Sequence, residues 1–156
     1  MKRKKLIVFS ALLFALVGYA VWIFLAGPIL IVRQIHNDNA KTVKLFCLSG
    51  ISPNRDAWMI GGIFHCAVAS GNQDIVKMMI VRSADVNRID GYGMTPLDVA
   101  TTGGDVSMMQ LLVNNSSDIS KRNRDGETAL DITIREKLDE PRKYLEQIAE
   151  KIKKTN

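Results

Sequence analysis

The side chains that could do chemistry in this chain are few. They include two histidines, His36 and His65, and two cysteines, Cys47 and Cys66. No grouping of histidine, cysteine and carboxylates has the spacing of a metal site. The motifs G-x-S-x-G, H-E-x-x-H and the P-loop are not present in the sequence. The sequence therefore predicts a protein that is not an enzyme, with no catalytic residues, no metal and no cofactor.

The aspartates recur at a fixed distance, which argues against a catalytic pair. Asp85 and Asp118 have the same separation in the sequence as Asp98 and Asp131. Such residues are positions of a repeat. The two cysteines are 19 positions apart. They could form a disulfide in an oxidising compartment, and two separate, partly buried thiols are the alternative.

The N-terminal segment differs from the rest of the chain. Residues 1–5 (MKRKK) are basic, and the 21 residues 6–26 contain no charged side chain. As a helix, residues 6–26 would span about 31 Å, close to the thickness of a bilayer core. We expect a transmembrane signal anchor over residues 6–27. A cleaved signal peptide is the alternative, although apolar residues continue past the weak cleavage pattern at residues 18–20.

Charge predicts how this anchor is oriented. Four basic residues lie in the tail 1–5, and after the apolar segment Arg33 is the only charged residue before Asp38. The positive-inside rule keeps the tail in the cytoplasm and sends the rest across one membrane, which in a bacterium is the inner membrane facing the periplasm. Removing the tail's four from 21 basic residues leaves 17 against 16 acidic ones. The net charge therefore reflects topology and predicts no nucleic-acid partner.

The remainder of the chain is built from an internal repeat whose period is about 33 residues. QDIVKMMI (Gln73–Ile80) aligns with VSMMQLLV (Val106–Val113), and SADVN (Ser83–Asn87) aligns with SSDIS (Ser116–Ser120). The period holds without insertion over about three and a half units. A unit of this length cannot hide its apolar face alone, so neighbouring units are predicted to stack.

Helix boundaries are clearest in the segment GYGMTPLDVATTGGD. Thr95 is a good N-cap, and Pro96 is tolerated in a first helical turn, where its missing N–H has no helical partner. Gly103 and Gly104 predict the stop and the chain reversal. The resulting helix has barely two turns, so it depends on its neighbours.

These features together resemble the ankyrin repeat. The resemblance lies in DGYGMTPLDVA followed by GGDVSMMQLLV, and in HCAVASGNQDIVKMMIVRSADVN, and it covers roughly residues 29–134. It implies an all-α solenoid of about 3.5 repeats over residues 28–137, behind the transmembrane helix. It also implies that His65, at the histidine position of the T-P-L-H motif, makes structural hydrogen bonds. His36 is expected near the end of a first helix at Ile29–Asn37.

Two parts of the chain depart from the family pattern. Gly61 and Gly62 stand where the capping threonine and its predecessor are expected, so the turn before them should be looser. After residue 137 the pattern is lost, and Pro141 opens an amphipathic helix with an apolar stripe. We predict that residues 138–156 form the capping helix of the solenoid, with its stripe at Tyr144, Leu145, Ile148 and Ile152.

The resemblance also implies where a protein partner binds. In the family, the variable positions of the D-x-x-G-x-T turns carry recognition, and aromatic, methionine and arginine side chains are enriched at interfaces. Tyr92 is the strongest candidate because glycines flank it, whereas Trp58 could instead fold inward. The predicted partner-binding residues are Trp58, Met59, Ile89, Tyr92, Met94, Arg122, Arg124 and Glu127, with Asp125 in the same turn.

The expected function is therefore a membrane-anchored, non-catalytic binding module that recognises one protein and has no small-molecule substrate. Its architecture is similar to that of bacterial immunity proteins, which neutralise a toxic effector such as a phospholipase. That likeness is an analogy from architecture. A scaffold or stress-protection factor for an envelope enzyme or complex is the alternative.

Overall fold

The computed structural model describes residues 17, 18, 30, 33, 35, 51–56 and 62–155. In this part of the chain the secondary structure consists of helices, with one isolated bridge between Asp56 and Gly62 and no strand. The expectation of an all-α fold is confirmed. The helices are α4 (Ile63–Ala69), α5 (Gln73–Val81), α6 (Pro96–Thr102), α7 (Val106–Asn114), α8 (Ala129–Arg135) and α9 (Asp139–Thr155).

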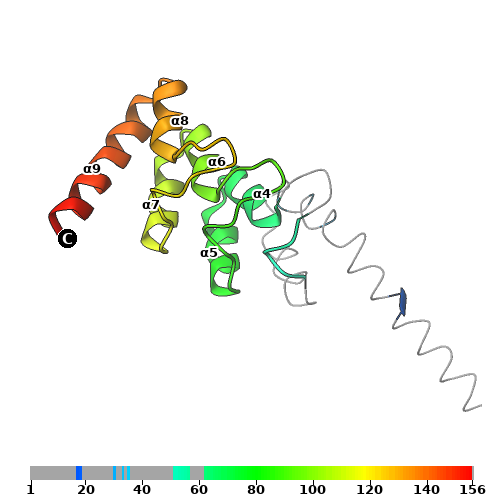
Figure 1. The fold of residues 1–156 in the computed structure, drawn as a ribbon. Coiled ribbons are helices and arrows are strands. Elements are labelled where there is room, and N and C mark those ends of the chain that lie inside the picture. The colour runs from blue at the N-terminus through cyan, green and yellow to red at the C-terminus, as the bar shows by residue number, and fades with distance from the viewer. Residues whose placement is uncertain are drawn as a thin grey trace, which may run out of the picture.

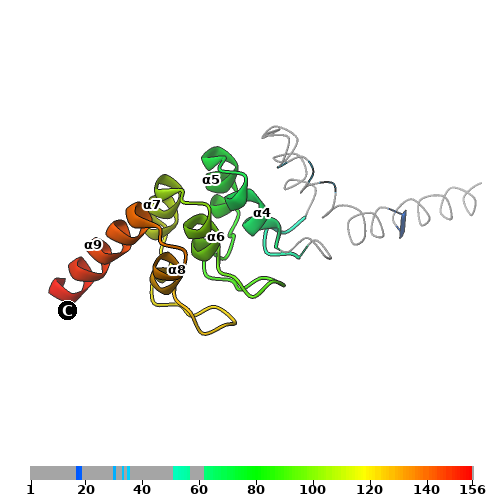
Figure 2. The same ribbon diagram turned by 90° about the horizontal axis from the view of Figure 1, so that it is seen from above.

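The helices stack in two rows that follow the sequence period. Helices α4, α6 and α8 begin at Ile63, Pro96 and Ala129, and helices α5, α7 and α9 begin at Gln73, Val106 and Asp139, so each step equals one period of the repeat. Figure 1 shows the pairs following one another in chain order toward the C-terminus. Seen from above in Figure 2, α4, α6 and α8 form one row and α5, α7 and α9 form the other. This is the stacked arrangement that the repeat predicted.

Polar caps define where the first-row helices begin. The Thr95 hydroxyl accepts a hydrogen bond from the Asp98 N–H, and the Asp98 carboxylate accepts one from the Thr95 N–H, which together form a capping box. Thr128 and Asp131 repeat this box at the start of α8. Helix α4 begins after Gly62 without a side-chain cap, as the missing threonine predicted.

Chain reversals between the two rows use a left-handed residue at one fixed position. Gly71 and Gly104 have φ of 72° and 67° there, and Gly103 ends α6 as predicted. Lys137 occupies the same position before α9, with φ of 56°. A residue with a Cβ is less favourable in this conformation, so the last reversal departs from the repeat in sequence while keeping its geometry.

The core runs continuously between the rows. Ile75, Met79, Leu97, Met108 and Leu112 are each at most 1 % exposed. Burying a side chain of this size stabilises the fold by roughly 1.5–3 kcal/mol before entropy is counted. Leu30, Arg33 and Ile35 are helical, and Ile35 is fully buried in the same core. These three residues agree with the helix expected at Ile29–Asn37, whose other residues, His36 among them, lie outside the described ones.

Helix α9 holds the place of a second-row helix in the last repeat, besides covering the end of the array. It starts one period after α7, and Leu145 is buried like Leu112 at the matching position of that helix. Its stripe is only partly covered, because Ile148 is half-buried and Ile152 is 46 % exposed. Pro141 lies inside the first turn and does not open the helix, because α9 already begins at Asp139.

Asparagine side chains tie each repeat to the next. Asn87 donates to the Ser116 carbonyl (3.0 Å) and accepts from the Asp118 N–H (2.8 Å). Asn54 makes the same two bonds one period earlier, at 2.8 and 2.6 Å. The next residue in this series is Ser120, which is too short to continue it.

Among the described helices, none has the length and apolar character needed to cross a membrane. The basic tail 1–5 and the anchor expected at residues 6–27 lie outside the described residues, apart from Val17 and Gly18, which are helical.

Candidate partner-binding surface

Two turns project from the first row of helices and carry most of the predicted partner-binding residues. They run from Asp90 to Thr95 and from Asn123 to Thr128, and both point away from the second row (Figure 2). The turn that would carry Trp58 and Met59 lies outside the described residues.

A side-chain oxygen at the base organises each turn. The Asp90 carboxylate, 5 % exposed, accepts from the N–H groups of Tyr92 (3.0 Å) and Met94 (3.1 Å). The Asn123 amide oxygen accepts from the corresponding N–H groups of Asp125 and Glu127 at 3.0 and 2.9 Å. Aspartate and asparagine favour such turns because their short side chains can bond backbone two residues ahead. Asp90 and Asn123 were not among the predicted site residues, although both begin a D-x-x-G-x-T-type motif.

Arg124 fastens the second turn to the first. Its N–H donates to the Gly93 carbonyl at 2.8 Å, and its guanidinium donates to the Gly91 carbonyl at 3.0 Å. Gly93 allows this approach, because a Cβ there would lie 2.6 Å from the Arg124 Cβ. Arg124 was predicted as a partner contact, which stays a prediction; what the structure shows is that it braces the neighbouring turn.

His65 fastens the first turn to α4. Its Nε2 lies 3.0 Å from the carbonyl oxygens of both Arg88 and Met94, so this nitrogen must carry the proton and donate. Burial lowers the pKa of the His65 imidazole, although the negative charge of Asp90 opposes that shift. The neutral ring therefore serves a structural role, as predicted.

The other predicted contact residues differ in their solvent exposure and in whether they already bond within the protein. Tyr92 is 65 % exposed, whereas Met94 and Ile89 are half-buried. Arg122 is exposed and donates to the Gly126 carbonyl within its own turn. Glu127 is half-buried, and its Oε2 lies 3.4 Å from the Arg135 guanidinium, so much of its charge is already compensated.

The described residues bring together no group of three or more histidine, cysteine or acidic side chains that could hold a metal. Cys66 is buried, and burial raises the pKa of its thiol to about 11, which makes it a poor nucleophile. Cys47 lies outside the described residues, so the disulfide expectation is untested.

Comparison with known proteins agrees with this geometry. Residues 64–113 match the family described as ankyrin repeats (many copies). This part of the chain is therefore similar to ankyrin repeats. The chain is also 34 % identical over 73 residues to the ARF GTPase-activating protein Git of Drosophila melanogaster. That match covers 44 % of this chain but only 10 % of the fly protein. The GTPase-activating activity in its name is a property of the fly protein.

Proposed function

We propose that this ankyrin array binds one protein partner through the tips of its projecting turns, with Tyr92 as the central contact. The exposure of Tyr92 carries the proposal: its side chain is 65 % exposed, while the Asp90 carboxylate holds its backbone N–H. An aromatic side chain on a held backbone loses little conformational freedom when a partner covers it. Repeat arrays present extended surfaces of this kind to their partners.

The rest of the surface divides into contacts and supports. Asp125 is exposed at the position that follows Tyr92 by one period, and it supplies a charge at the rim. Arg122 is also exposed, but it already donates to the Gly126 carbonyl within its own turn. Arg124 and Glu127 already bond within the array, so they act mainly by keeping the turns in register. Rim charges of this kind affect association rate and specificity more than affinity.

The test is to place a photo-crosslinking benzoyl-phenylalanine at position 92 of the full chain and identify the protein it captures. The affinity of that protein is then measured for wild type, Tyr92→Ala and Val81→Ala. Val81 is a matched control because it is an apolar side chain, 85 % exposed, at the end of α5. We expect Tyr92→Ala to weaken binding about tenfold or more and Val81→Ala to leave it unchanged. Equal affinities for all three would refute the turn surface.

We further propose that residues 6–26 tether the array to a membrane, on the side opposite the basic tail 1–5. The support is the uncharged length of residues 6–26 together with that tail. In a bacterial host, alkaline phosphatase fused after residue 156 should then be active. Inactive fusion protein of normal abundance would contradict this topology.

Within this proposal the module acts as an inhibitor of the immunity type, and the captured partner decides that point. A toxic effector encoded beside the gene supports inhibition. A constitutive envelope complex containing the chain in fixed stoichiometry favours the scaffold alternative instead.

A further inference from the structure

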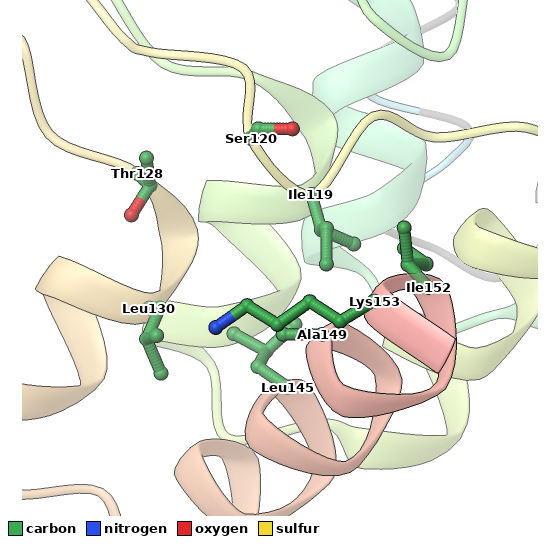
Figure 3. Close-up of a pocket in the computed structure, with 8 residues that line it drawn as sticks. All are labelled: Ile119, Ser120, Thr128, Leu130, Leu145, Ala149, Ile152 and Lys153. Atoms are coloured by element: carbon green, nitrogen blue, oxygen red, sulfur yellow. The ribbon is translucent and has the colours of Figure 1, made fainter. Parts of the chain in front are cut away.

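The last repeat contains a cavity beside the C-terminal half of α9. It has a volume of about 290 Å³ and lies between that helix, the segment before α8 and the start of α8 (Figure 3). It is separate from the turn tip that carries Tyr92. Its lining consists of Ile119, Ser120, Thr128, Leu130, Leu145, Ala149, Ile152 and Lys153.

The cavity forms because α9 is longer than α5 and α7. After α5 and α7 the chain turns away through Ser83 and Ser116, which have φ of 63° and 69°. The corresponding residue on α9 is Ala149, where the helix continues to Thr155. The loop that Asn87 clasps one repeat earlier therefore has no counterpart facing Ser120. The space between Ser120 and α9 stays open.

Of the polar side chains that line the cavity, the two hydroxyls have hydrogen-bond partners within the protein, whereas the lysine amine forms no ion pair in the described part of the chain. The Ser120 hydroxyl donates to Asp118 and the Thr128 hydroxyl donates to Asp131, both at 2.8 Å. Lys153 is the only charged residue in the lining, and none of the ion pairs in the described part of the chain involves it. Figure 3 shows its aliphatic stem lying across the cavity between Ile119 and Leu145, with the amine toward Leu130.

We propose that this cavity binds a medium-chain aliphatic carboxylate, with its tail among Ile119, Leu130 and Leu145 and its carboxylate paired with Lys153. The apolar lining matches an alkyl tail, and a single ammonium on a flexible stem matches one anionic end. If each non-hydrogen atom takes about the 30 Å³ share of a water molecule, the cavity holds on the order of ten atoms. Octanoate has that size. The proposal is independent of the turn surface and would survive its failure.

The test uses the full chain in phosphatidylcholine nanodiscs, which accommodate its apolar N-terminal segment. Octanoate is titrated while methyl NMR signals of Ile119, Leu145 and Ile152 are followed, so binding to lipid is not counted. We expect saturable shifts at these three methyl groups. No shift at any of them, while octanoate is present in excess, would overturn the proposal.

Charge and size are then tested separately. Lys153→Met should weaken octanoate binding about two- to fivefold and remove its salt dependence, whereas Lys154→Met, the neighbouring lysine outside the lining, should change nothing. Octanol should bind wild type as weakly as octanoate binds Lys153→Met. Equal binding to both lysine variants would refute the role of Lys153.

Tail burial predicts a length series. From hexanoate to octanoate, each added methylene should tighten binding about fourfold, and the gain should stop once the cavity is full. Ala149→Phe should fill the cavity and reduce octanoate binding more than tenfold while leaving the thermal unfolding midpoint at or above that of wild type. Wild-type binding by a folded Ala149→Phe protein would show that the ligand sits elsewhere.

Discussion

The middle repeat, α6–α7, and the last repeat, α8–α9, share helix positions and differ in what covers them. Asp98 is fully buried, whereas Asp131 is exposed at the same position one period later. Met109 is fully buried, whereas its counterpart Arg142 is exposed and pairs with Glu146 at 2.8 Å. The comparison shows that burial at positions that face inside a repeat is the same in both repeats. Positions that face the next repeat are buried only where such a repeat packs against them.

The comparison predicts its largest effect in the core. Leu112→Ala should lower the free energy of unfolding by about 3–5 kcal/mol, because this side chain is fully buried. Leu145→Ala should cost less, about 2–3 kcal/mol, because Leu145 already borders an open cavity and its loss creates less new void. Urea unfolding followed by circular dichroism measures both. Equal losses would mean that the last repeat is packed as tightly as the middle one.

Local chemistry made much of this fold predictable from the sequence. Thr95 and Gly104 were assigned correctly because a cap and a left-handed turn need particular residue types wherever they occur. The structural role of His65 was predictable on another ground, the resemblance to the ankyrin repeat, whose T-P-L-H motif has a histidine at this position. The period then placed the repeats, since nothing is inserted between them.

Features that depend on a neighbouring repeat were not predictable in the same way. The brace from Arg124 to Gly91 links residues 33 positions apart and follows only from the stacking. The place of α9 as a second-row helix was obscured because its outward positions, such as Arg142, no longer need to be apolar. The cavity beside Ala149 follows from where α9 ends, which periodicity does not specify.

A smaller effect should appear in the pH dependence of the two capping boxes. Burial raises the pKa of the Asp98 carboxyl, and the hydrogen bonds from Thr95 only partly offset this. Hydrogen bonds from Thr128 lower the pKa of the Asp131 carboxyl, which stays exposed to water. The same Thr–Asp pair therefore shifts in opposite directions, because one is covered by the next repeat and the other is not.

The two shifts make opposite contributions to stability. The unfolded carboxyl has a pKa of about 3.9. Because the folded pKa of Asp98 lies above that value, its contribution is fully present below about pH 4 and is lost as the pH rises through the folded pKa. Because the folded pKa of Asp131 lies below it, its contribution is present above about pH 4 and is lost as the pH falls through the folded pKa.

Asp98→Asn and Asp131→Asn turn this difference into a measurement, since an amide oxygen can still accept the hydrogen bond from the threonine N–H. The stability of each variant relative to wild type is followed by thermal unfolding between about pH 3 and pH 7. Asp131→Asn should be most destabilising at neutral pH, and its deficit should shrink as the pH falls. The stability of Asp98→Asn relative to wild type should be highest at neutral pH and should fall as the pH is lowered toward about 4. Parallel profiles would mean that burial by the neighbouring repeat does not control the ionisation of these carboxyls, and the contrast between the two repeats would then be one of packing alone.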